Sequence, residues 1–187
     1  MSVESPETGR LPATGVWTID PLHSTAGFRV RHHAVARFRA RFADLEGTYD
    51  AATRTLRGSV GVDSVQVIDM LRDHLQSDAF FDAANNPRIE FVSTSIAVDG
   101  GELSVDGDLT MRGVRRPVHA TGTITGPSRV QHYDGTAHDH IGIDLATTID
   151  RRDFGVNFNN ELLDGRLNLG WHVDLELELE LTTPVDG

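Results

Sequence analysis

The chain has 187 residues, of which 28 are acidic and 17 are basic, so its formal net charge is −11. A chain of this length is expected to form one domain with a substantial core. The acidic balance argues against nucleic acid as a partner, because phosphate backbones attract basic surfaces, and the absence of cysteine excludes disulfides and thiolate metal sites.

The amino-terminal segment is polar and lacks the apolar stretch of a secretory signal. We expect residues 1–14 to form a disordered lead-in, followed by a single barrel domain over residues 15–183. No run of residues approaches the ~18 apolar residues of a membrane-spanning helix. The expected location of the protein is therefore the cytoplasm.

The chain then alternates between apolar and polar residues, a pattern that predicts β-strands because successive side chains of a strand point to opposite faces. Strands are expected at about 16–20, 25–32, 56–67, 88–98, 102–111, 117–125, 141–149 and 167–181. Residues 34–49 alternate more loosely. The parity of the apolar residues shifts between Val62 and Val65, which predicts a β-bulge there.

One helix is predicted at about 70–82, where apolar residues recur at helical spacing before Asn85-Asn86-Pro87 ends it. Asp99-Gly100-Gly101 predicts a tight hairpin. Residues 126–140 are polar and irregular, which indicates a surface loop, and residues 150–155 suit a short helical turn.

The last stretch alternates from Leu167 to Leu181 almost without fault. At roughly 3.3 Å per residue this run would span about 50 Å, which is too long for one flat strand in a small domain. We therefore expect the sheet to curl and close. The predicted fold is all-β: an eight-stranded antiparallel, lipocalin-like β-barrel with one helix (about 70–82) and short helical turns.

Four segments of the chain together resemble one known family. They are residues 19–24 (IDPLHS), residues 72–91, which contain RDHLQS, FFD and PRIEF, residues 107–118 (GDLTMRGVRRPV) and residues 149–159 (IDRRDFGVNFN). In this order they resemble the YceI-like, polyisoprenoid-binding family over nearly the whole chain. The resemblance implies a lipocalin-like barrel whose tunnel holds an isoprenoid tail, such as a polyprenyl chain or a quinone. A homodimer is compatible with it.

An eight-stranded barrel has just enough interior to be filled by its own side chains or to hold one slim ligand. Periodicity alone favours a packed core, whereas the resemblance favours a ligand tunnel. The candidate ligand-binding residues are apolar and are expected to line the tunnel walls and ends: Phe28, Val30, Phe42, Phe80, Phe81, Phe91, Leu109, Leu145, Phe154, Phe158, Trp171, Leu175 and Leu177.

Two groups of polar residues are candidates for the polar mouth of this tunnel. One group is Asp20, His23 and Arg72, and the other is Asp153, Asn157 and Asn159. The sequence does not decide between them.

The first group lies near Ser24, Asp73 and His74 in the sequence, so the ingredients of a Ser/His/Asp triad are present. The chain has no G-x-S-x-G motif that would mark a nucleophile elbow. A structural role for these residues is favoured, and we expect no catalytic residues.

His132, His138 and His140 lie together with Asp134 and Asp139 in the segment 126–140. His and Asp side chains can bind a divalent metal, but such loops are common without one. We expect no metal and no cofactor, and whether this segment binds metal stays open.

The positive charge of the chain gathers between Arg29 and Arg41, with Arg31, Arg37 and Arg39 between them. The simpler interpretation is a solvated outer face of the barrel. The alternative hypothesis is transient docking on anionic lipid, through which the protein would load or release its ligand.

These observations predict a non-enzymatic protein that binds, stores or transports a long isoprenoid or other long apolar lipid. Two alternatives remain. One is a packed barrel that acts through protein contacts in a stress response, and the other is an enzyme acting on a lipid-like small molecule.

Overall fold

The computed structural model describes residues 9–131 and 133–185, in which ten strands form one antiparallel sheet. The strands in chain order are β1 (Val16–Ile19), β2 (Thr25–His32), β3 (Ala36–Phe42), β4 (Leu45–Asp50), β5 (Thr55–Gly61), β6 (Arg88–Asp99), β7 (Glu102–Met111), β8 (Val114–Gln131), β9 (Ala137–Asp150) and β10 (Leu169–Pro184). One α-helix, α1 (Asp69–Gln76), and two short 3-10 helices, η1 (Val62–Ser64) and η2 (Arg151–Phe154), complete the structure.

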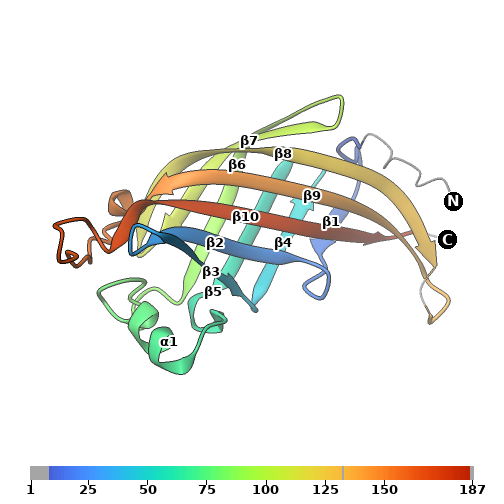
Figure 1. Ribbon diagram of the computed structural model, residues 1–187. Helices are drawn as coiled ribbons and strands as arrows, with labels where there is room; N and C mark the ends of the chain where they lie inside the picture. Colours follow the sequence, from blue (N-terminus) through green and yellow to red (C-terminus); the bar gives the residue numbers. More distant parts are fainter. Residues whose placement is uncertain (1–8, 132, 186–187) are drawn as a thin grey trace, which may run out of the picture.

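The ten strands occupy eight positions around a closed barrel. Both β1 and β2 pair with β10: Ile19 of β1 lies opposite Leu181, and Phe28 of β2 lies opposite Leu175. In the next position β4 pairs with β1, and β3 pairs with β2. Two short strands, β1 and β2, therefore share the barrel position beside β10, and β4 and β3 share the next position (Figure 1). The predicted fold, an eight-stranded antiparallel barrel, is confirmed.

The two ends of the barrel are built differently. At the end formed by β1, β4 and the last residues of β10, hereafter the closed end, continuous ladders join β10 to β1, β1 to β4 and β4 to β5. At the end formed by β2, β3, η2 and the first residues of β10, hereafter the open end, β3 contacts the segment after β5 through few bonds. These include the Gln66 amide to the Arg41 carbonyl at 2.8 Å and a bridge between Phe42 and Val65.

Helix α1 lies on the side where β3 and β5 part (Figure 1). It ends at Gln76, six residues before the predicted end near residue 82, and residues 77–82 form turns. The Ser77 hydroxyl donates to the His74 carbonyl at 2.7 Å, and this local side-chain bond competes with helix continuation. Phe80 and Phe81 are therefore presented from a turn and not from a helix.

Two further expectations are wrong. Residues 126–140 are mostly not a loop, because β8 and β9 extend as a hairpin in which Arg129 pairs with Asp139. The parity shift after Val62 is not a bulge but the 3-10 helix η1, which takes the chain out of the strand. The sequence pattern did not reveal the hairpin of β8 and β9 because its residues are polar on both faces. A strand pair outside the core needs no alternation of apolar and polar residues.

Other local predictions are confirmed. Residues 151–154 form the short helix η2, and Gly100 and Gly101 connect β6 to β7 with φ angles of 57° and 90°. Two successive positive φ angles are those of the two-residue hairpin turn that suits the twist of paired strands, and glycine adopts them without strain.

Part of the expected lead-in, residues 1–8, lies outside the described residues. Residues 9–14 instead contact the barrel. The Gly9 amide donates to the Ile124 carbonyl at 3.2 Å, and Leu11 packs against the core of the closed end. In the described part of the chain, no helix is long and apolar enough to cross a membrane.

Candidate functional site

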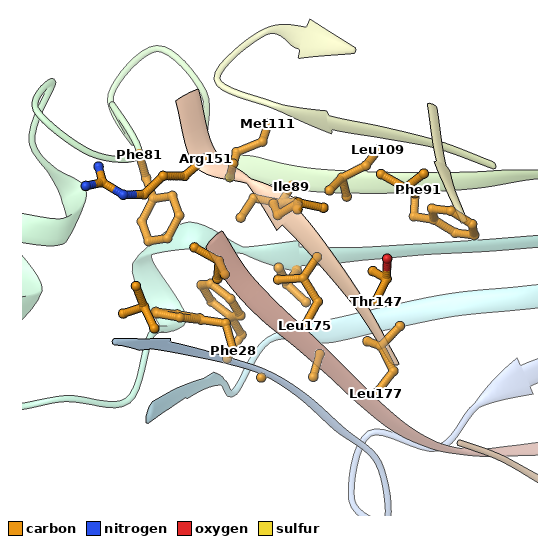
Figure 2. A pocket seen from close by; sticks show the side chains of 18 of the residues that line it. Phe28, Phe81, Ile89, Phe91, Leu109, Met111, Thr147, Arg151, Leu175 and Leu177 are labelled. Atoms are coloured by element: carbon orange, nitrogen blue, oxygen red, sulfur yellow. The ribbon is translucent and has the colours of Figure 1, made fainter. Parts of the chain in front are cut away.

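An apolar cavity of about 380 Å³ lies inside the barrel. This volume falls within the range of about 300–1,000 Å³ that is typical of small-molecule sites. Its walls come from strands around the barrel and from the α1 side, as Figure 2 shows for Phe28, Phe81, Phe91 and Leu175.

The cavity exists because small side chains occupy inward positions at its centre. Ala26, Gly58, Ala120 and Thr147 all line it. A Cβ atom built on Gly58 would meet only one atom within 4 Å, the Glu46 carbonyl oxygen at 3.7 Å. Large residues at these positions would fill the interior, and protein cores are otherwise close-packed.

The change from packed core to cavity can be followed along β10. Leu181 is fully buried and Leu179 is 7% exposed, and both belong to the core of the closed end. Leu175 and Leu177 are inward-facing residues of the same strand, yet they are only partly buried because they border the cavity.

The lining residues of β10 run from Leu169 to Leu179. These ten steps correspond to about 33 Å of strand at roughly 3.3 Å per residue. A volume of about 380 Å³ spread along such a length forms a narrow channel, and its shape suits an extended chain better than a compact molecule.

The structure places ten of the thirteen candidate ligand-binding residues in the cavity wall. These are Phe28, Val30, Phe42, Phe80, Phe81, Phe91, Leu109, Leu145, Leu175 and Leu177.

The other three candidates do not line the cavity. Phe154 is buried in the neighbouring core, and the Phe158 ring packs on Phe80 at 5.3 Å between centroids. Trp171 lies over the guanidinium of Arg151 at 4.4 Å. Alternation alone could not place these residues, because Phe154 lies in η2, Phe158 follows it and Trp171 lies within a register shift of β10.

The first predicted polar group does not come together. Asp20 and His23 form a pair at the closed end, with Asp20 Oδ2 2.7 Å from His23 Nδ1, and the Asp20 amide donates to the Glu180 carbonyl. Arg72 of α1 instead donates to the Val65 and Val67 carbonyls and pairs with Asp69. Arg72 therefore fastens the helix to the segment that follows η1.

The second predicted polar group has mainly structural contacts. Asp153 and Asn157 are exposed, and the Asn157 amide donates to the Gly155 carbonyl. The Asn159 side chain exchanges two hydrogen bonds with the backbone of Leu169, at 2.6 and 3.0 Å. Asn159 thus holds the chain against the start of β10.

At the closed end, the residues of the possible triad form hydrogen bonds with the backbone instead. The Ser24 hydroxyl accepts a hydrogen bond from the Glu180 amide at 2.9 Å. The side chain of His23 is largely exposed, and its hydrogen bond with Asp20 raises the pKa of the imidazole. This arrangement joins β10 to the turn before β2.

Among the described residues, one cluster of three side chains could offer ligands to a metal ion: Asp20, His23 and Glu180, whose ligand atoms lie within 4.8 Å of one another. Its atoms already share hydrogen bonds, including His140 Nδ1 with Glu180 Oε1 at 2.6 Å. Of the predicted histidines, His138 and His140 lie on β9, and His132 lies outside the described residues.

The basic stretch is partly neutralised by β10. Arg29 pairs with Glu176 and lies 3.8 Å from Asp174, and Arg37 also approaches Asp174. Arg41 donates to the Gln66 side chain. These contacts make the outer face of β2 and β3 less positive than the sequence indicates.

Arg151, which the sequence analysis missed as a site residue, lines the open end of the cavity and is 3% exposed. Its Nε donates to the Gly170 carbonyl at 2.9 Å, and its Nη1 donates to the carbonyls of Val156 and Phe158 at 2.8 and 2.9 Å. Burial lowers the pKa of this guanidinium. Its position within the motif at residues 149–159 was the available signal, but nothing in the pattern distinguished it from its exposed neighbour Arg152.

Three other polar side chains line the same end of the cavity: His32, His74 and Asn168. Burial lowers the pKa of the His32 imidazole, with a further contribution from the neighbouring His33. The His74 ring packs edge-on against Phe80 and Phe158. The cavity thus combines long apolar walls with polar groups at the open end.

A profile of the YceI-like domain matches residues 17–181. The chain is similar to the protein YceI of Escherichia coli O157:H7, with 30% identity over 140 residues that cover 72% of this chain and 71% of the relative.

Two solved structures share the fold. Burkholderia cenocepacia BcnA has a TM-score of 0.70 at 21% identity, and the match covers 87% of this chain and 98% of that protein. A polyisoprenoid binding domain from Saccharophagus degradans, implicated in plant cell wall breakdown, has a TM-score of 0.67 at 16% identity, and the match covers 90% of this chain and 98% of that domain.

Replacing Leu181 by alanine is expected to lower the free energy of unfolding by about 2–5 kcal/mol, as for other fully buried leucines. Leu177→Ala should cost less than half as much, because the Leu177 side chain already borders the cavity. Urea unfolding of both variants measures the difference. Equal losses would mean that the region around Leu177 is packed like the closed end.

The Asp150 carboxylate, paired with Arg152, has its pKa lowered from 3.8 to about 2. A carboxyl whose pKa is depressed by folding stabilises the protein above its unfolded pKa, and this contribution disappears as the pH falls from about 4 to about 2. We expect Asp150→Asn to cost less than about 1 kcal/mol at pH 7, as for exposed ion pairs, and the difference from the wild type to vanish near pH 2. Urea unfolding across this range, with Asp153→Asn as the control, checks it; a difference that persists at pH 2 would contradict the electrostatic origin.

Proposed function

Since the chain belongs to the YceI-like family, we propose that it binds a long apolar lipid, such as an isoprenoid with a polyprenyl or quinone tail, inside its barrel. The observation that carries this proposal is the narrow apolar channel bordered by β10 between Leu169 and Leu179. The solved relative described as a polyisoprenoid binding domain supports the choice of an isoprenoid.

Burial of apolar surface would supply the affinity. Large ligands realise only about 0.3 kcal/mol per non-hydrogen atom, so a 20-carbon isoprenoid would bind with about −6 kcal/mol, which corresponds to tens of micromolar. Each further isoprene unit accommodated in the channel would add to this. Such binding suits a carrier or store, which holds its cargo without reacting with it.

The proposal is for a binding protein and not for an enzyme. Four polar side chains, His32, His74, Arg151 and Asn168, line the open end of the cavity, while its long apolar walls provide the contact area. A packed barrel that acts through protein contacts is less compatible with a cavity of about 380 Å³. The cytoplasmic location and the homodimer remain predictions.

We also infer that the open end contacts a membrane surface when ligand is transferred. Large apolar side chains are exposed there: Val35 in the turn between β2 and β3, Ile68 and Met70 at the start of α1, and Leu163 in the segment before β10. These segments lie on the same side of the barrel (Figure 1). A lipid tail could then pass from the bilayer into the cavity with little exposure to water.

Filling the cavity should abolish binding while leaving the fold intact. We expect Gly58→Leu to weaken the binding of radiolabelled geranylgeraniol at least tenfold, because the leucine would project into the cavity beside Phe91, the register partner of Gly58 on β6. Gly58→Ala should have a smaller effect. Thr121→Leu, which adds the same side chain at an exposed position on β8, is the matched control and should bind as the wild type does.

Thermal unfolding verifies that each of these variants is folded. Mass spectrometry of the organic-solvent extract of the wild-type protein identifies any lipid that purifies with it. Undiminished binding of geranylgeraniol by folded Gly58→Leu would overturn the proposed binding site.

Membrane contact is tested by flotation with vesicles of equal parts phosphatidylcholine and phosphatidylglycerol. Burial of a Val or Leu side chain is worth about 1.5–3 kcal/mol, so the double variant Val35→Ser, Leu163→Ser should float at least tenfold less. The triple variant Arg37→Gln, Arg39→Gln, Arg41→Gln should lose less, because β10 already neutralises part of that surface. Equal flotation of the double variant and the wild type would exclude the apolar contact.

A further inference from the structure

The buried Arg151 forms no ion pair with a carboxylate among the described residues, although the charge of the adjacent Asp150 acts on it. Its three hydrogen bonds go to backbone carbonyls, and the ring of Trp171 covers its guanidinium. Its neighbour Asp150 pairs with Arg152 instead. An ionised group that is removed from water without a counter-charge is costly, by several kcal/mol in folded proteins.

One atom of this guanidinium is left without a partner. Nη2 of Arg151 is shielded from solvent and has no hydrogen-bond partner in the part of the chain that the structure describes. Buried polar atoms are almost always hydrogen-bonded, so such an exception calls for an explanation. Nη2 carries two hydrogens that no acceptor among the described residues uses.

A second orphaned atom lies in the wall of the same cavity. The side-chain oxygen Oδ1 of Asn168 is buried and has no partner among the described residues. Rotation of the amide about its last bond would present the NH₂ group to a ligand instead. The backbone of Asn168 is held in place, since its amide donates to Asn160 and its carbonyl accepts from His33.

The position of Arg151 relative to the apolar walls suits a ligand with a polar head. Figure 2 shows the guanidinium at one end of the row of lining side chains, with Leu175, Leu177 and Phe91 extending away from it. A chain lying along these residues would therefore bring one of its ends to Arg151. The opposite end of the chain would point toward the packed core of the closed end.

We propose that Arg151 binds an oxyanion at the head of the ligand, so that the protein selects an acidic amphiphile, with a phosphate or carboxylate on a long apolar chain, over a neutral alcohol with the same chain. This inference rests on the proposed function, because the head reaches Arg151 only when the chain occupies the cavity. A hydrogen bond from a guanidinium to an oxyanion is stronger than one to a neutral oxygen, and the anion would supply the missing counter-charge.

The test compares two ligands that differ only in the head: geranylgeranyl phosphate and geranylgeraniol. For the wild-type protein we expect the phosphate to bind at least tenfold more tightly than the alcohol in equilibrium binding measurements. In Arg151→Gln the ratio should fall to about one, mainly through weaker binding of the phosphate. Arg152→Gln removes the adjacent exposed arginine and should keep the wild-type ratio.

Two further measurements keep the test decisive if Arg151→Gln does not fold. Asn168→Asp places a carboxylate of the same shape in the cavity wall, and it should lower the ratio by repelling the oxyanion. Inorganic phosphate is added as a competitor, and at millimolar concentration it should not displace geranylgeranyl phosphate, because it lacks the apolar chain.

The outcomes separate the two proposals. Equal binding of the phosphate and the alcohol by the wild type would overturn the role of Arg151 and leave lipid binding intact. Binding of neither ligand would overturn the proposed function itself. Displacement by inorganic phosphate alone would show a free-anion site, and an unchanged ratio in folded Arg151→Gln would show that Arg151 only holds the backbone.

Discussion

The structure depends on the backbone hydrogen bonding of one long strand. β10 pairs with β9 from His172 to Pro184 on one side, while on the other side it pairs with β2 through its first half and with β1 near its end. The barrel can close only because both short strands share this edge. At the same time, the break between β1 and β2 allows the two ends of the barrel to differ. β4 pairs with β1 at the closed end, whereas β3 pairs with β2 at the open end.

This difference between the ends explains where the interior is solid and where it is hollow. At the closed end, the continuous ladders bring inward side chains such as Tyr49, Val105 and Leu181 into a packed core. Along the cavity, inward positions such as Ala26 and Gly58 carry small residues. At the open end, the parting of β3 from β5 is covered by α1 and the turn that presents Phe80 and Phe81. Dispersion contacts are lost around the cavity, so the closed end carries more of the stability of the barrel.

The polar groups divide in the same way. At the closed end, Asp20, His23 and Ser24 are tied to each other and to the backbone of Glu180, and they secure the turn between β1 and β2. At the open end, Arg151 holds the segment from Val156 to Phe158 and the start of β10, while its Nη2 has no hydrogen-bond partner among the described residues. If the proposed ligand binds there, its head would therefore act on a group that also secures the cavity wall.

The sequence by itself determined most strands and the barrel, because alternation of apolar and polar residues reflects burial on one face and needs no knowledge of distant contacts. It indicated the family through the resemblance of four short segments. It also identified ten residues of the cavity wall, eight of them on strands, since inward parity is a local property. It failed where periodicity is absent or interrupted: at the end of α1 after Gln76, in the hairpin of β8 and β9, at Phe154 and Phe158 in and after η2, and at Trp171 in the register shift of β10. Only the tertiary structure decided that the interior is hollow, that Asp20 and Arg72 do not meet, and that Arg151 rather than Arg152 is buried. These properties depend on summed side-chain volumes and on hydrogen bonds between segments far apart in the chain, which no local pattern encodes.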